Sequence, residues 1–177
     1  MIRANRFGTL LSSASLAIAL AASAGMGGLA CTTPMYRISD GMRWHPSQRV
    51  GVPDLEAEGW RRTSAQDADL AFYRPGAGIF AVRVRCPAPD DEVPLRWESR
   101  GLWLGVPRER VERRPAVVDG FYGMTMHGQL GELALRTLVV RTETCSLDIA
   151  QVAPSGADGE VLFDAFIARV RLTEETP

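Results

Sequence analysis

The chain begins with a segment that does not belong to a folded domain. Arg3 and Arg6 give it a positive start, residues 10–24 are almost wholly Ala, Leu, Ile and Ser, and small residues follow. This is the layout of a secretory signal, which is removed on export. We therefore predict that residues 1–30 are a cleaved signal peptide and that the fold begins after them. The alternative is a retained membrane helix, because residues 7–30 are long enough to span a bilayer.

Cys31 directly follows this segment and closes the run Gly27-Gly28-Leu29-Ala30-Cys31. A cysteine in this place resembles the lipobox of bacterial lipoproteins, in which the sulfur is acylated before the signal is cut off. The pattern prefers Leu and a small residue where this chain has Gly28 and Leu29. The resemblance implies that lipidated Cys31 anchors an exported lipoprotein in a membrane. Thr32, which is not the Asp of inner-membrane retention, favours the outer membrane. Ordinary cleavage near Ala30, which leaves a free periplasmic protein, is the alternative.

The three cysteines support this interpretation. Cys31, Cys86 and Cys145 would lie in an oxidising compartment, where disulfides persist. A Cys86–Cys145 disulfide leaves Cys31 over, and acylation explains the leftover thiol. Two long acyl chains on one residue hold a protein stably on a membrane. Two separate buried thiols at Cys86 and Cys145 remain the alternative.

Removal of residues 1–30 leaves a chain of modest size and weak charge. The whole sequence has 177 residues and a formal net charge of -1, and the loss of Arg3 and Arg6 without any acid makes the charge more negative. The chain that remains after this removal has a length that suits one domain with its own core. The sequence contains no basic stripe, so we expect no nucleic-acid partner.

The residues after Cys31 are polar and show little periodicity. We predict that residues 31–58 are a tether and an approach to the fold. From Gly59 the pattern changes, and residues 59–172 are predicted to form a single domain. Residues 69–74 and 79–86 flank the turn-forming run from Pro75 to Gly78, which predicts a β-hairpin. In its second strand Phe80, Val82, Val84 and Cys86 share one face, which we expect in the core, and Ala81, Arg83 and Arg85 share the other, which we expect in solvent.

The rest of the domain is predicted to contain helices and strands without a βαβ alternation. Acidic residues at 90–92 and Pro94 predict a short helix over residues 95–104. Strands are expected at 117–127, 133–141 and 145–152, with a turn at Gly128-Gln129, and a final helix at 158–172. This order favours an α+β fold with an antiparallel β-sheet flanked by helices.

With these elements placed, the mature region resembles the Mog1/PsbP-like fold, in particular small bacterial lipoproteins that carry it. The residues that carry the resemblance are Asp69 to Pro75, Ala81 to Cys86, Gly120 to Gly128, and Cys145 to Asp148 before a Phe-containing final helix. The resemblance implies an α/β/α sandwich, and it implies a docking or assembly module without shared catalytic residues.

The sequence offers few candidates for catalysis. His127, Ser146 and Asp148 are nominally available for a triad, but no Gly-x-Ser-x-Gly elbow surrounds a serine. Neither Cys-x-x-Cys nor His-Glu-x-x-His is present, and Asp67 and Asp69 lack the Gly and Glu that complete a calcium loop. We therefore predict no catalytic, cofactor-binding or metal-binding residues, and no cofactor.

Binding is the better prediction for this chain. Arg83, Arg85 and Trp97 are the candidate interface residues, since tryptophan is enriched at binding hot spots. We expect a lipid-anchored, non-catalytic envelope protein that docks onto another envelope protein. The first alternative is a periplasmic hydrolase, which requires His127 close to an acid in a cleft. The second is a small-ligand carrier with a pocket between sheet and helices.

Overall fold

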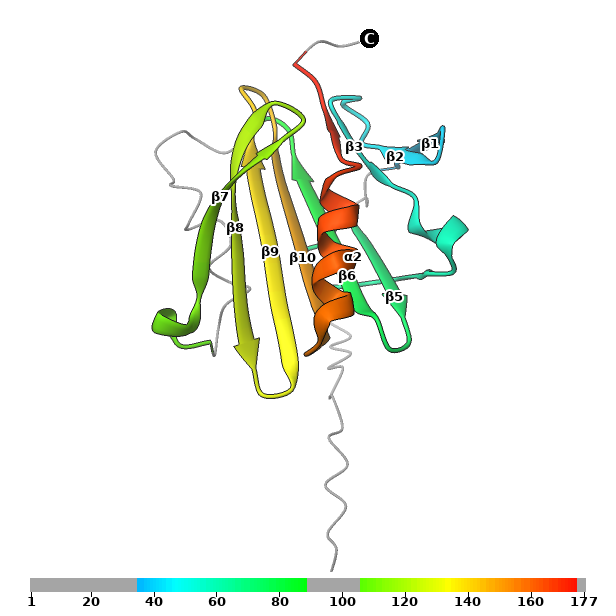
Figure 1. Ribbon diagram of the computed structural model, residues 1–177. Coiled ribbons are helices and arrows are strands. Elements are labelled where there is room, and N and C mark those ends of the chain that lie inside the picture. The colour runs from blue at the N-terminus through cyan, green and yellow to red at the C-terminus, as the bar shows by residue number, and fades with distance from the viewer. Residues whose placement is uncertain (1–34, 89–105, 175–177) are drawn as a thin grey trace, which may run out of the picture. The chain divides into compact units, whose positions relative to one another are not determined.

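The computed structural model describes residues 35–88 and 106–174, and these residues form two antiparallel sheets and one α-helix (Figure 1). The large sheet has seven strands in the order β4-β5-β6-β10-β9-β8-β7. Its strands are β4 (Arg61–Thr63), β5 (Leu70–Arg74), β6 (Gly78–Arg85), β7 (Glu112–Val118), β8 (Phe121–Leu130), β9 (Leu133–Arg141) and β10 (Ser146–Pro154). A 3-10 turn, η3 (Arg108–Arg110), precedes β7.

The prediction of a tether over residues 31–58 is wrong for most of that range, because residues 37–58 are part of the folded domain. They form β1 (Arg37–Ser39), β2 (Met42–Trp44), β3 (Val50–Pro53) and the 3-10 turn η1 (Leu55–Glu58). The three strands form a small sheet with β11 (Arg171–Leu172) in the order β1-β2-β3-β11, in which β11 pairs with β3. Val50 and Val52 are fully buried. The segment is too short and too rich in turns to show a hydrophobic period, and partners at the other end of the chain order it.

The predicted hairpin is present as β5 and β6. The two strands pair in register from Leu70 opposite Val82 to Arg74 opposite Gly78. Phe80, Val82 and Val84 are buried on the predicted core face. The turn uses two glycines with positive φ, Gly76 and Gly78.

The predicted strand at 117–127 is two strands. A two-residue turn at Asp119 and Gly120 separates β7 from β8, with Val118 paired to Phe121. Both turn residues have positive φ, as a type I′ hairpin turn requires. Asp-Gly is the usual sequence of that turn, and it lay unrecognised inside an apolar run. The turn expected at Gly128-Gln129 is also wrong, because β8 continues to Leu130 and the chain reverses before Leu133.

The final helix, α2 (Ala157–Ile167), ends earlier than the predicted 172, because the chain turns into β11. Its Phe163 and Phe166 stack on Phe80, with ring centroids 6.4 and 4.7 Å away. The helix therefore covers the face of the sheet that carries the core (Figure 1). Within the described residues this is one α-helix on one face, so the fold is more β-rich than the predicted α/β/α sandwich. The helix predicted at 95–104, with Trp97 and Trp103, lies outside the described residues.

The turn glycines provide a test of this packing. A Cβ at Gly78 would lie 2.0 Å from the carbonyl oxygen of Val152, whereas a Cβ at Gly76 would meet nothing within 4 Å. We expect Gly76→Ala to lower the free energy of unfolding by about 1–2 kcal/mol through backbone strain alone. Gly78→Ala should lower it by about 3–5 kcal/mol, since β6 must also move away from β10. Urea unfolding of both variants measures the difference, and equal losses would contradict the contact.

Candidate functional site

A disulfide closes the upper end of the large sheet. Cys86 follows β6 and Cys145 precedes β10, and their sulfurs are 1.97 Å apart, as the cysteine pattern predicts. The Ser47 hydroxyl lies 3.5 Å from the Cys86 sulfur, so the loop between β2 and β3 packs against the bridge. His45 Nδ1 lies 2.9 Å from the same hydroxyl. The bridge thus lies where the two sheets meet.

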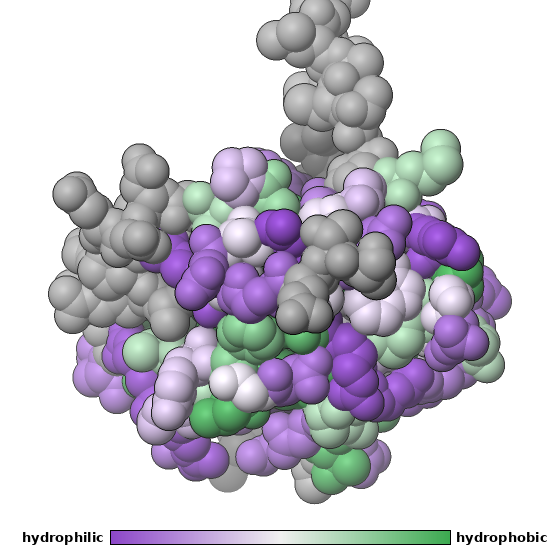
Figure 2. Space-filling model, turned by 90° about the horizontal axis from the view of Figure 1, so that it is seen from above, coloured by the Kyte–Doolittle hydropathy of each residue, from purple (hydrophilic) through white to green (hydrophobic). Residues whose placement is uncertain are grey.

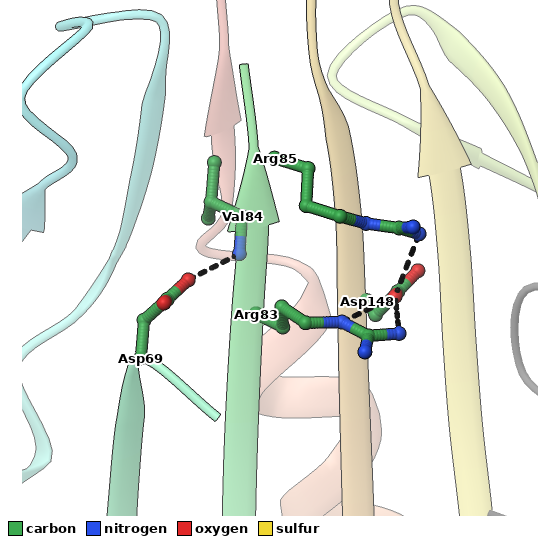
Figure 3. Close-up of polar contacts among 5 residues, drawn as sticks. All are labelled: Asp69, Arg83, Val84, Arg85 and Asp148. Carbon is green, nitrogen blue, oxygen red and sulfur yellow. Dashed lines mark hydrogen bonds and ion pairs between the residues drawn. The ribbon is translucent and has the colours of Figure 1, made fainter. Parts of the chain in front are cut away.

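Arg83 and Arg85, the predicted interface arginines, point toward a shared carboxylate on the neighbouring strand (Figure 3). Arg83 donates from Nε and Nη2 to Asp148 Oδ2, at 3.1 and 2.6 Å, and Arg85 Nη2 donates to the same oxygen at 3.3 Å. Asp148 is buried and the two arginine side chains are about one-third exposed. The predicted solvent-exposed face is therefore half-buried here, and its arginines are held by an internal ion pair.

The nominal triad is not assembled. Ser146 and Asp148 share one face of β10, and the cross-strand register places His127 on the opposite face of the sheet, beside α2. The ring of His127 contacts the edge of Phe163, with centroids 6.0 Å apart. The residues that a serine hydrolase would need thus lie on two sides of one sheet.

A row of polar residues crosses the helix-facing side of the sheet instead. Direct cross-strand pairing aligns Glu112, His127, Arg136 and Gln151, and the row ends at Phe80. Arg136 Nη1 donates to Gln151 Oε1 at 3.2 Å, and both side chains are buried. The Nε2 atom of Gln151 is buried without a hydrogen-bond partner in the structure. Polar groups in such a place cost stability unless they are paired, so this row departs from simple core packing.

Gly159 makes room for Arg136 under the first turn of α2. A Cβ at Gly159 would lie 2.9 Å from Arg136 Nη1, so any larger residue would push the guanidinium away from the helix. The nearby start of α2 has no side-chain cap; Gly156 occupies the cap position, and Asp158 is the second residue of the helix. The buried guanidinium of Arg136 therefore lies against the start of α2, which carries the positive end of the helix dipole. Glu160 in the first turn of the helix partly offsets both positive charges.

An open cleft of about 390 Å³ lies over the outer half of this row. Three arginines and two glutamates line it: Arg110 before β7, Glu112 and Arg114 on β7, Arg136 on β9 and Glu160 on α2. A second hollow of about 400 Å³ lies on the other side of the α2 start, beside the β5–β6 turn. The cleft over the polar row presents charges of both signs around His127.

The polar groups of the cleft can bind charges and form hydrogen bonds. Ser155 Oγ accepts from Gln129 Nε2 at 2.8 Å, and no hydrogen bond joins His127 to another side chain of the described residues. Within that part of the chain, no group of three or more His, Cys, Asp or Glu is placed to hold a metal ion. The arrangement is suited to recognising a polar surface.

Sequence reasoning missed Arg136, Gln151, Gly159 and Glu160. One signal was present: Arg136 interrupts the alternation of the apolar run 133–141 at a position that faces the core. Trp97, the third predicted interface residue, lies outside the described residues.

Comparisons with known proteins give a likeness of fold. The structure is similar to the solution structure of cyanobacterial PsbP (CyanoP) from Synechocystis sp. PCC 6803, with a TM-score of 0.49 and 12% sequence identity. The likeness covers 85% of this chain and 99% of that chain. No protein family matches the sequence, and no curated protein does. Among the described residues, no helix has the length and apolar character needed to cross a bilayer.

The disulfide gives a test of stability. Cys86 and Cys145 are 59 residues apart, and the chain-entropy argument assigns such a loop about 4 kcal/mol. We expect the Cys86→Ala/Cys145→Ala protein to lose about this much free energy of unfolding in denaturant titrations. Cys31→Ala is the matched control and should leave the midpoint unchanged. A reductant should reproduce the double variant, and insensitivity to both changes would contradict a stabilising bridge.

The two histidines predict a pH dependence. Burial lowers the pKa of both His45 and His127, against weaker opposite effects of Asp69 and Glu160. The folded protein therefore resists protonation that the unfolded chain accepts near pH 6.5, so stability is complete above that pH and falls on acidification. We expect a flatter profile between pH 7.5 and 5.5 for His45→Asn and His127→Asn, and the flattest for the double variant. Stability that rises on acidification would contradict this.

Proposed function

We propose that the protein is a membrane-anchored envelope lipoprotein that works by docking onto another envelope protein and is not itself an enzyme. The observation that carries the proposal is the disulfide. It occupies Cys86 and Cys145 and leaves Cys31, at the end of the signal segment, as the remaining cysteine. A bridge of this kind persists after export, and acylation gives the third cysteine a role.

The cleft beside α2 is the proposed docking surface. It is open, and Glu112 and Arg114 stand on its rim with more than half of each side chain exposed. The buried side chain of Arg136, which is hydrogen-bonded to Gln151, places a positive charge at the base of the cleft. Charges of both signs around this cleft favour a partner with complementary polar groups, because electrostatic complementarity contributes more to the specificity of binding than to its affinity.

A small-ligand carrier is the second candidate function. The cleft lies between the sheet and α2, which is where a carrier of this fold class would hold its ligand. Its walls are mainly charged and polar, so the ligand would be polar.

Site-specific crosslinking in the native envelope tests the docking proposal. A photoreactive amino acid replaces Arg114 in the cleft or, as the matched control, Arg113, which lies next to it on the other face of β7. We expect one protein adduct from position 114 and none from position 113. The adduct should disappear in Cys31→Ser, because the protein then leaves the membrane.

Intact mass of the same material tests the anchor. We expect the mass of the chain from residue 31 with acyl chains attached. The mass of the unmodified chain would contradict the lipoprotein proposal. Equal adducts from positions 113 and 114 would contradict the proposed docking surface. An adduct smaller than a protein would favour the ligand carrier.

A further inference from the structure

We propose that β1, with Met35 before it, is a membrane-contacting surface that lies against the phospholipid headgroups of the bilayer holding Cys31. The inference rests on the proposed acylation of Cys31. It adds which part of the domain faces the bilayer and which part faces away.

The distance along the chain is the first argument. Met35 is four residues after Cys31, so their Cα atoms can be at most about 14 Å apart. The headgroup layer on each side of a bilayer is itself about 5–8 Å thick. The ten residues of β8 extend about 33 Å, so the allowed separation is less than half the length of that strand. An acylated Cys31 therefore keeps the start of the domain at the membrane surface.

The chain cannot lengthen this connection without unfolding. Tyr36 is buried in the main core cluster and contacts His45 edge-on, with ring centroids 5.6 Å apart. The next residue, Arg37, pairs with Trp44 across β1 and β2. The fixed part of the domain thus begins five residues after the proposed anchor.

The side chains at this place suit a headgroup region. Met35 is 89% exposed and Ile38 is 57% exposed, so two large apolar side chains lie at the surface where the domain begins. Arg37 between them is exposed and forms no ion pair or side-chain hydrogen bond with the described residues. β1 is the edge strand of its sheet, so side chains of both its faces can reach a surface that meets the edge. Apolar side chains can then enter the interface while the guanidinium binds a lipid phosphate.

The rest of this end of the molecule has a mixed surface. Figure 2 looks onto the end where β1, β2 and β3 lie, and shows small apolar patches among hydrophilic residues. Such a surface fits contact with headgroups better than deep insertion.

This orientation has a consequence for the docking cleft. β1 and β2 lie at the upper end of the domain, whereas the start of α2 and the β8–β9 turn, which border the cleft, lie at the lower end (Figure 1). Contact of β1 with the bilayer therefore directs the cleft away from the membrane, where a partner can reach it.

Fluorescence quenching by lipids tests the inference. The full lipidated protein carries an environment-sensitive thiol label at Ile38→Cys or, as the matched control, at Val161→Cys, an exposed apolar site on α2. Native cysteines are then occupied by the disulfide and the acyl group. Each protein is reconstituted into vesicles of phosphatidylethanolamine and phosphatidylglycerol with or without a lipid that bears a nitroxide near its headgroup. We expect at least twofold quenching at position 38 and little at position 161.

The outcomes separate this inference from the proposed function. Intact mass of each sample first establishes acylation, and a chain without acyl mass overturns both. If the protein is acylated and position 38 is not quenched, the membrane contact is wrong while the anchor stands. Equal quenching at both positions also overturns it, because the domain then has no preferred face. Equal unfolding midpoints of the two variants confirm that the label sites leave the fold intact.

Discussion

The structure depends on the pairing of β10 with strands on both of its sides. β10 is in register with β6 along Ser146–Val152 and with β9 along its whole length, so it joins the two halves of the sheet. Side chains alternate along it with a period of two, and a slip of one residue would move every core residue to the other face. Leu147 and Ile149 face α2 in this register, and the aromatic stack of α2 on Phe80 holds the helix there.

The same alternation carries polar residues under the helix. Gln151 follows Ile149 on the core face, and pairing aligns it with Arg136 and His127 on the next strands. A fold that only needed a core would place apolar residues there, because buried polar groups are costly when they are not fully bonded. Gly159 in the facing helix accommodates this row. The buried polar groups that lower stability are concentrated in this row. The row borders the open cleft, and for this reason we propose the cleft as the binding site.

The two ends of the domain have different chemistry. The upper end holds the disulfide and the small sheet, and the exposed Met35 and Ile38 lie there a few residues along the chain from Cys31. At the lower end charged residues surround a cleft beside the start of α2. With the acyl anchor that we propose at Cys31, such a domain would direct its cleft away from the membrane.

The sequence by itself determined the features that depend on neighbouring residues. The β5–β6 hairpin and its core face and the strand over 133–141 were predicted from local pattern. The pairing of Cys86 with Cys145 is long-range, and it was predicted from the number of cysteines and not from local pattern. The small sheet, the row through Arg136 and the ion pair of Arg83 with Asp148 were not, because each joins residues far apart in the chain. Local propensity depends only on nearby residues and does not indicate those partners. The register of β10 with its neighbouring strands decided which side chains meet.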